Sequence, residues 1–313
     1  MVKNSKKTKV SIVILTINSK EMLKGALKNI SSVKTNGVNV DCIVVDNGST
    51  DGTKEEFQNY QLKNAKYKFI ETGRNLGFAG GNNVAFRKIM NNDGYTVVLN
   101  DDIILPEDFL LKSVKFMDES QNVGASSPKI YFAKGYEFHR DRYKENQKGK
   151  VIWYAGGDID WKNIYTSHRG VDEVDSDQYS EVIDTDLANG ACMIVRNEVF
   201  RKVGLLDEGF YLYWEDADFC QRVKKQGYRV TYNPDVAVWH KVSASSGGPG
   251  NKSNDYFLVR NRLYFALRYA KLRTKLAVLK DTLRLCFVGR DWQKLGAKDA
   301  LMGKKGAGPW VKS

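Results

Sequence analysis

Three carboxylates stand close together in the segment 210–220, FYLYWEDADFC, directly behind four aromatic residues. A chain that builds an ordinary core would avoid Glu215, Asp216 and Asp218 here, because an ionised carboxylate is costly to remove from water. Aromatic neighbours would partly desolvate Asp216, which raises the pKa of a carboxyl group and makes it a better proton acceptor. Two plain alternatives stand beside this one: acids are common in a first helical turn, and Asp218 is spaced to pair with Arg222 one turn later.

Polar residues also follow three strand-like runs, at the point where each run ends. They are Thr16 and Asn18, then Asp46 and Asn47, and finally Asn100, Asp101 and Asp102. In open α/β sheets, ligands bind beyond the carboxyl ends of the strands. Asp and Asn after a strand are also ordinary turn formers and helix caps. Any one of the three groups fits that alternative, but three in succession favour a common binding crevice.

The elements that would position these residues alternate between strand and helix. Runs of apolar, β-branched residues predict strands, and apolar residues at helical spacing predict helices. We expect strands at 10–16, 40–46, 66–72, 95–102, 189–196 and 228–242, and helices at 19–30, within 48–60, at 78–90 and at 197–204. This alternation predicts an α/β fold with a mostly parallel sheet between helices. The polar segment 133–180 is long for a plain connection, and such segments are often functional.

The 313 residues are 42% hydrophobic, which predicts a globular protein with a full core. The net charge of +12 is concentrated at the ends of the chain: +4 in residues 1–9 and +11 in residues 256–313, against −3 in residues 10–255. A protein that grips a nucleic-acid backbone spreads cations over its folded surface, so this distribution argues against nucleic acid as a partner.

Cysteine usage and the apolar pattern indicate the compartment. The four cysteines lie far apart and form no CxxC pair, which favours a reducing environment. The basic N-terminus runs directly into a strand pattern, unlike a secretory signal, and no apolar run approaches the ~18 residues of a spanning helix. We therefore expect a cytoplasmic protein, free or peripheral on the inner face of the cell membrane.

The C-terminal part has a different character. Residues 243–255 are rich in glycine and serine, which predicts a flexible stretch able to act as a lid. Beyond it, residues 256–287 have a helical pattern with leucines spaced four, three and four apart and cations between them: Leu272, Leu276, Leu279 and Leu283. A basic amphipathic helix suits an anionic membrane surface. It could equally pack on the domain and leave a solvated basic face.

Six motifs follow one another along the chain: VSIVILTIN, VVDNGSTDGT, NLGFAGGNN, LNDD, NGACMIVR, and GFYLYWEDADFCQRVKKQGYRV followed by WH. In this order they resemble the motifs of glycosyltransferase family 2, and the rhamnosyltransferase-like branch is the most similar. The resemblance covers roughly residues 10–270 and implies the GT-A fold with a helical C-terminal extension. It implies a catalytic domain over 1–255, with a donor half at about 10–130 and an acceptor half at about 131–255, and a basic helical segment at 256–313. The polar segment 133–180 would then lie on the acceptor side.

The resemblance also assigns roles to individual residues. Asp216 matches the catalytic base. Asp102 and His240 match metal ligands for Mn²⁺ or Mg²⁺, because LNDD occupies the place of the DxD-type element. Trp214, Glu215 and Gly190 would bind the acceptor. The donor-binding set is Thr16, Asn18, Asp46, Asn75, Gly77, Asn100, Asp101 and Arg260.

Several of these assignments have alternatives. Asn100 replaces the first acid of the metal-binding element, which weakens ligation there, and Asp101 is expected to turn away or to act through its backbone. Without the motif, a histidine such as His240 is more often a structural hydrogen-bonding residue. Glu215 is the nearest rival for the base, and the carboxylate of Asp46 could cap the next helix instead of binding a nucleotide base.

The function implied by the resemblance is metal-dependent, inverting transfer of a sugar from a nucleotide-diphosphate donor, either dTDP-rhamnose or a UDP-sugar. The acceptor would be a hydroxyl group in surface polysaccharide or glycolipid synthesis, on a carbohydrate or a lipid-linked glycan. Two other functions remain open. A non-catalytic nucleotide-sugar-binding protein would not need Asp216, and a sugar-phosphate nucleotidyltransferase would need a glycine-rich loop with a cation for a triphosphate, which the sequence lacks.

Overall fold

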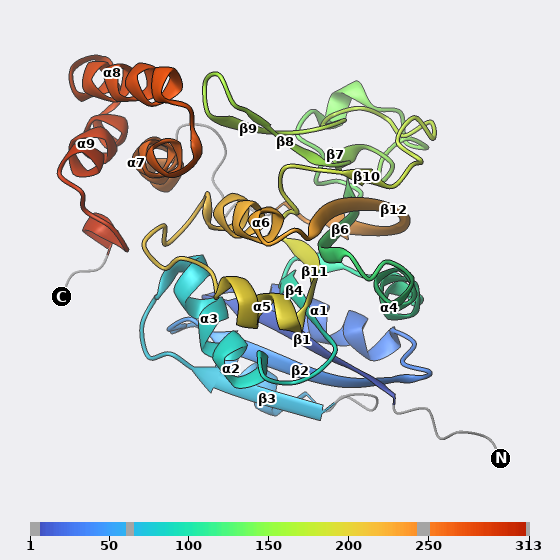
Figure 1. Ribbon diagram of the computed structural model, residues 1–313. Coiled ribbons are helices and arrows are strands. Elements are labelled where there is room, and N and C mark those ends of the chain that lie inside the picture. Colours follow the sequence, from blue (N-terminus) through green and yellow to red (C-terminus); the bar gives the residue numbers. More distant parts are fainter. Residues whose placement is uncertain (1–6, 61–65, 243–250, 311–313) are drawn as a thin grey trace.

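The computed structural model describes residues 7–60, 66–242 and 251–310. Strands and helices alternate through the first half of the chain, as the sequence predicts (Figure 1). The strands of this half are β1 (Thr8–Thr16), β2 (Val38–Asp46), β3 (Lys66–Glu71), β4 (Tyr95–Asn100), β5 (Ile103–Ile104) and β6 (Val123–Phe132). Its helices are α1 (Lys20–Ser32), α2 (Thr53–Gln58), α3 (Gly77–Ile89) and α4 (Phe109–Glu119).

The second half adds short strands and further helices. Its strands are β7 (Ile152–Tyr154), β8 (Gly157–Asp160), β9 (Tyr165–His168), β10 (Ile183–Asp184), β11 (Cys192–Arg196) and β12 (Arg229–His240). Its helices are α5 (Asn197–Val203), α6 (Glu215–Lys225), α7 (Lys252–Tyr269), α8 (Leu272–Val288) and α9 (Asp291–Leu301).

One large sheet runs through the described part of the chain, in the order β10-β12-β6-β11-β4-β1-β2-β3. The pairs β4-β1, β1-β2, β2-β3 and β6-β12 are parallel, which confirms the mostly parallel sheet. Strand β11 runs antiparallel between β4 and β6. Because β4 and β11 run in opposite directions, the end of β4 meets the start of β11, and both carry predicted site residues.

Helices cover both faces of this sheet because its central strands are apolar on both sides. In β1, Ile12 and Ile14 face one core cluster, and Val13 between them faces the other. Helices α1 and α4 complete the first cluster, and α3, α5 and α6 complete the second. Strands buried on both faces have near-continuous apolar runs in their sequence, as residues 10–16 do.

The polar segment 133–180 contains regular structure that its composition did not reveal. Strand β7 pairs with β6, and β8 and β9 form a separate antiparallel hairpin. Ring contacts join this segment to the main sheet: Trp153 of β7 lies edge-on to His240 of β12, with ring centroids 4.5 Å apart. The segment therefore covers the end of β12.

The C-terminal helical pattern is divided into three helices that pack together beside α6 and the β8-β9 hairpin (Figure 1). Helix α7 begins at Lys252, before the predicted boundary at 256, and the side chain of Asn251 caps it by accepting a hydrogen bond from the Ser253 backbone nitrogen at 3.0 Å. Residues 243–250, the main part of the predicted lid, lie outside the described residues. Within the described ranges, no helix combines the length and the apolar character that crossing a membrane requires.

Candidate active site

Asp216 lies in the first turn of α6 and is half-buried. One carboxylate oxygen accepts a hydrogen bond from the backbone nitrogen of Ala217 at 2.8 Å, and the other accepts from the backbone nitrogen of Gly190 at 3.2 Å. Burial raises the pKa of Asp216, in the direction that its aromatic surroundings predicted. A carboxylate that is oriented by backbone donors and poorly solvated is suited to accept a proton.

Glu215, the predicted rival, has a different environment. Its side chain is only 5% exposed, and its Oε2 has no hydrogen-bond partner among the described residues. Burial, together with the neighbouring charge of Asp216, raises the pKa of Glu215 well above its usual value. Because Asp216 is the more accessible of the two carboxylates, it is the better placed to meet a hydroxyl group from outside.

The loop before α6 has a strained backbone. Tyr211, Tyr213 and Trp214 have φ angles of 65°, 63° and 76°, in a region that residues other than glycine rarely adopt. Such residues persist only where surrounding contacts hold them, at a cost of about 1–3 kcal/mol each. These φ angles turn the chain so that α6 begins at Glu215. The turn thereby sets the direction of the Glu215 and Asp216 carboxylates.

Asn261 of α7 supplies the contacts that hold this loop. Its amide nitrogen donates to three carbonyl oxygens: those of Phe210 at 2.9 Å, Leu212 at 2.8 Å and Tyr213 at 2.9 Å. The side chain is fully buried, so these bonds are shielded from water. Helix α7 is therefore part of the scaffold of the site.

The predicted donor-binding role of Arg260 does not fit the structure. The side chain is 0% exposed, and its guanidinium donates to the carbonyl oxygens of Gly306 at 2.6 Å and Phe210 at 2.9 Å. Its Nε donates to the Asn261 side chain at 2.9 Å. The sequence showed a cation near the motifs but could not show that α7 turns it inward, where it braces the strained loop.

Trp214 is also placed differently from the prediction. Its ring is buried and packs on Phe265 of α7, with centroids 4.7 Å apart. Tyr211 is likewise stacked on Phe257, at 5.2 Å. These rings therefore fix the loop against α7, and they do not present open faces to a sugar.

Asp218 forms the pair expected from local spacing. Its Oδ2 accepts a hydrogen bond from Arg222 Nε at 2.9 Å, which confirms the i,i+4 interaction. Its Oδ1 accepts from Tyr269 at 2.7 Å and also pairs with Arg268. The carboxylate is fully buried and surrounded by these donors, so Asp218 joins α6 to α7 and plays a structural part.

Asp102 and His240, the predicted metal ligands, lie side by side. Asp102 Oδ1 is 3.1 Å from His240 Nε2, and both side chains are buried. The β5-β12 ladder brings them together, because His240 pairs with Ile103, the residue after Asp102. The Lys241 backbone nitrogen also donates to the Asp102 carbonyl at 2.9 Å.

This pair has the chemistry of part of a metal site. One carboxylate and one imidazole suit Mn²⁺ or Mg²⁺. Asp102 Oδ1 contacts His240 Nε2, and His240 Nδ1 has no hydrogen-bond partner within the described ranges. No group of three or more His, Cys, Asp or Glu side chains that could hold an ion occurs in the part of the chain that the structure describes. A cation there would complete its coordination with substrate oxygens and water, as Mg²⁺ commonly does.

Asp101 faces the end of β1. Its Oδ2 accepts a hydrogen bond from Thr16 Oγ1 at 2.7 Å, so the side chain joins two of the predicted strand ends. Burial raises the pKa of Asp101 to about 6. Thr16 and Asp101 are thereby brought together, as the convergence of strand ends predicted.

The segment 189–191 joins the two ends of the site. The backbone nitrogen of Asn100, two residues before Asp102, donates to the carbonyl of Ala191 at 2.9 Å. The backbone nitrogen of Gly190, the residue before Ala191, donates to the Asp216 carboxylate. The predicted acceptor-binding Gly190 thus donates to the candidate base, and this short segment connects it to the strand end that precedes Asp102.

The turn after β2 holds Asp46 and Asn18. Asp46 is buried, and its Oδ1 accepts a hydrogen bond from the Ser49 backbone nitrogen at 3.0 Å. Asn18, exposed and with a φ of 47°, accepts from the Thr50 backbone nitrogen at 2.8 Å. The bond from Ser49 to Asp46 does not cap α2, because Ser49 lies before the helix, and Asp51 accepts the hydrogen bond from the first residue of α2.

Asn75 and Gly77 link the donor-side loop to the loop before α6. The side-chain oxygen of Asn75 accepts hydrogen bonds from Asn47 Nδ2 at 3.0 Å and from the Gly77 backbone nitrogen at 2.8 Å. Gly77 has a φ of +74°, and a Cβ there would lie 2.5 Å from the ring and the carbonyl of Tyr211. Only glycine allows this approach. The motif NLGFAGGNN therefore serves to bring two loops together.

Three further residues of this region make contacts that the sequence did not predict. Asn47 fastens the loop around Asn75, and the side chains of Asn189 and His168 meet at 3.0 Å beside Gly190. The ring of His168 also lies 4.7 Å from Trp153, which in turn contacts His240. In the sequence, Asn47 follows a strand end, Asn189 begins the motif NGACMIVR, and His168 lies within the long polar segment.

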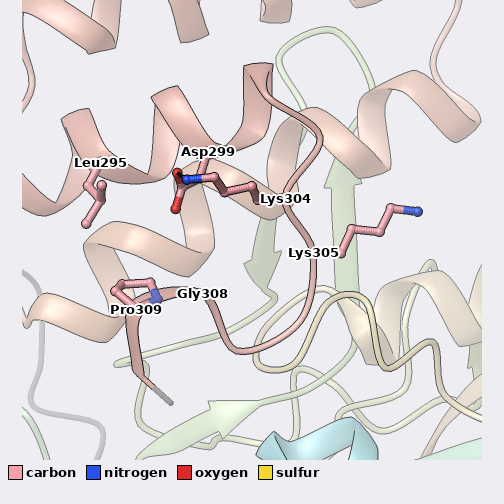
Figure 2. Close-up of a pocket in the computed structure, with 6 residues that line it drawn as sticks. All are labelled: Leu295, Asp299, Lys304, Lys305, Gly308 and Pro309. Atoms are coloured by element: carbon pink, nitrogen blue, oxygen red, sulfur yellow. Dashed lines mark hydrogen bonds and ion pairs between the residues drawn. The ribbon is translucent and has the colours of Figure 1, made fainter. Parts of the chain in front are cut away.

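One hollow in the described residues lies away from these side chains. It has a volume of about 490 Å³ and is lined by Leu295, Asp299, Lys304, Lys305, Gly308 and Pro309. Figure 2 shows Asp299 turned toward Lys304, which it pairs with at 2.9 Å, whereas Lys305 points away. None of the predicted site residues lines this hollow, and its one carboxylate is already neutralised.

Comparison with known proteins decides the family. Residues 11–204 match the family model described as glycosyl transferase family 2, which is more than half of the chain. The chain belongs to glycosyl transferase family 2. The predicted resemblance to this family is thereby confirmed.

Similar proteins include several glycosyltransferases. The low-salt glycan biosynthesis hexosyltransferase Agl10 of Haloferax volcanii is 25% identical over 71% of this chain and 63% of its own length. The rhamnosyltransferase WbbL of Escherichia coli is 27% identical over 74% of this chain and 83% of its own length. The N-acetylglucosaminyl-diphospho-decaprenol L-rhamnosyltransferase of Mycobacterium tuberculosis is 24% identical over 75% and 77%. The chain thus spans less than two thirds of Agl10.

Solved structures bear on the fold alone, because their identity to this chain is low. The mannosyltransferase PcManGT from Pyrobaculum calidifontis, in complex with GDP-Man and Mn²⁺, has a TM-score of 0.56 at 18% identity and covers 96% of this chain and 75% of its own. S. aureus TarS 1-349 in complex with UDP-GlcNAc has a TM-score of 0.58 at 15% identity and covers 94% and 80%. The predicted GT-A fold is confirmed.

Proposed function

We propose that this protein is a metal-dependent, inverting glycosyltransferase that moves a sugar from a nucleotide-diphosphate donor to an acceptor hydroxyl. The observation that carries the proposal is the bridge made by residues 189–191. It joins a half-buried, backbone-oriented carboxylate at Asp216 to the strand end that bears Asp102. A proton acceptor and a site for the leaving diphosphate are therefore parts of one structure.

The residues divide the chemistry between them. Asp216 removes the proton from the acceptor hydroxyl while that oxygen attacks the anomeric carbon from the face opposite the diphosphate. Asp102 and His240 would hold Mn²⁺ or Mg²⁺, which neutralises the charge of the leaving group. Thr16, Asp46 and their loop neighbours form the donor side.

The names of similar proteins indicate which donors and acceptors to test first. Two of them are rhamnosyltransferases and one is a hexosyltransferase of glycan biosynthesis, so dTDP-rhamnose and UDP-sugars are the first donors to test. The acceptor is a carbohydrate or lipid-linked glycan at the cytoplasmic side of the membrane. Residues 1–255 form the catalytic part, with α7 as its support from the C-terminal segment.

The experiment combines a donor screen with product analysis. The full chain is incubated with Mn²⁺, a series of UDP-, dTDP- and GDP-sugars and a series of glycan acceptors. We expect release of the nucleoside diphosphate for one donor class and a product of inverted anomeric configuration by NMR. A product of retained configuration would refute the mechanism. Binding without turnover would favour the non-catalytic alternative, and synthesis of nucleotide-sugar from a triphosphate would favour a nucleotidyltransferase.

A further inference from the structure

The outer helix of the C-terminal group, α8, exposes its apolar side. Figure 1 shows α8 at the edge of the molecule, far from β3. Of its residues, only Val278 and Thr282 are buried. The exposed apolar side chains and their exposed fractions are Leu272 (73%), Leu276 (58%), Leu283 (47%) and Phe287 (79%).

These four side chains form one stripe along the helix. Residues four, eleven and fifteen positions after Leu272 lie within about 60° of one another around a helix of 3.6 residues per turn, and the stripe is about 22 Å long. A helix that packs on its own domain normally turns such a stripe inward. Here the side that faces the domain is partly polar: Asp281 pairs with Arg262 of α7 at 2.6 Å.

Cations flank this stripe on both sides. By helical periodicity, Arg273 and Lys280 lie along one edge, and Lys275 lies along the other. Arg273 and Lys280 are exposed, and none of the three forms an ion pair with any carboxylate that the structure describes. The surface that results is apolar in the middle and positive at its borders.

We propose that this face of α8 docks the protein on an anionic lipid surface, with the stripe in the acyl boundary and the cations among the headgroups. The charge pattern selects this occupant. A second copy of the chain would bring identical positive borders together, and like charges in contact are unfavourable. A bilayer with anionic lipids instead offers an apolar layer beneath negative headgroups, which matches both parts of the surface.

The proposal does not depend on the reaction, but it has a consequence for it. Helix α8 packs on α7, and α7 holds the loop that precedes Asp216 through Asn261. Docking through α8 would therefore keep the candidate base close to the membrane, where a lipid-linked acceptor is found.

The test is sedimentation of the full chain with vesicles. We expect binding to phosphatidylcholine vesicles that contain about one third phosphatidylglycerol, weak binding to pure phosphatidylcholine, and loss of binding at high salt. Leu276→Ser with Phe287→Ser is expected to lower affinity at least about 100-fold, because two large apolar side chains no longer leave water. Arg273→Glu with Lys280→Glu is expected to lower it at least about 25-fold, since each lost cation contributes about fivefold.

The control variants change exposed residues away from α8. Val171→Ser with Val182→Ser removes two side chains that are 41% and 38% exposed, and Lys115→Glu reverses a charge on α4. They are expected to bind vesicles like the wild type. Transfer to a water-soluble acceptor should be unchanged in all variants, so failure of docking and failure of the proposed reaction are distinguishable.

Three results would overturn the proposal. The wild type could fail to prefer the anionic vesicles, or the stripe variant could bind them as well as the wild type does. Light scattering could also show that the wild type is a dimer and the Leu276→Ser, Phe287→Ser variant a monomer, which would assign the stripe to a second copy of the chain.

Discussion

Replacing Asn261 by alanine tests whether α7 positions the candidate base. The substitution removes the amide that donates to the carbonyls of Phe210, Leu212 and Tyr213. An amide group has two hydrogens, and each net hydrogen bond contributes about 1 kcal/mol, with a further cost where a buried carbonyl is left unpaired. We therefore expect the free energy of unfolding to fall by about 2–3 kcal/mol.

The effect on activity should exceed that of lost stability. Tyr211, Tyr213 and Trp214 together store about 3 kcal/mol of backbone strain at least, and without Asn261 the loop can relax toward ordinary φ angles. Relaxation moves the start of α6 and with it Asp216, and a displacement of about 1 Å costs about 100-fold in rate. We expect kcat to fall by about that factor at a temperature where the variant is folded, with donor affinity within about twofold.

Asn197→Ala provides the matched control. Asn197 is also buried and makes two side-chain hydrogen bonds, to Thr96 at 2.7 Å and to the Asn92 carbonyl at 3.2 Å, but at the opposite end of β4 and β11. Stability is measured by urea unfolding and kcat by release of the nucleoside diphosphate. The reasoning is refuted if Asn261→Ala loses stability but keeps kcat, or if both variants lose kcat equally.

Three further predictions follow from individual contacts. Glu215→Gln should raise the melting temperature above neutral pH. The pKa of this buried acid is raised in the folded state, so the ionised carboxylate destabilises the fold, and does so fully above the folded-state pKa. The gain in melting temperature should therefore shrink as pH falls toward the unfolded-state pKa. Differential scanning fluorimetry across pH measures this, and a gain that grows in acid would contradict it. Gly77→Ala should cost about 2–4 kcal/mol in urea unfolding, because its methyl group would overlap Tyr211; a loss under ~0.5 kcal/mol would show that the loops part freely. His240→Ala should weaken Mn²⁺-dependent donor binding at least about tenfold in titration calorimetry, while metal-free binding stays the same; equal loss in both conditions would remove His240 from the metal site.

The sequence predicted those features that depend on neighbouring residues. The pair between Asp218 and Arg222 lies within one helical turn, and the strand ends at Thr16 and Asp101 follow from the βα alternation. The direction of the Asp216 pKa shift also agrees with the prediction, and burial is its largest cause.

What the sequence could not give are contacts between distant segments. Arg260 is a cation in a basic region, and only the packing of α7 shows that it points inward to Phe210. Similarly, the sequence does not show that the ring of Phe265 packs on that of Trp214. Periodicity indicates which side of a helix is apolar but not which neighbour meets it, and on α8 the side chains of Leu272, Leu276 and Phe287 are more than half exposed.

The rate of sugar transfer by Asp216→Asn, measured in a single turnover beside its affinity for the donor, tests the central claim most directly. The amide keeps the size of the side chain and cannot accept the proton. The account predicts a transfer rate lower by about 10²–10⁴-fold, with donor affinity within about twofold of the wild type. A rate within tenfold of the wild type would show that a group other than Asp216 removes the proton.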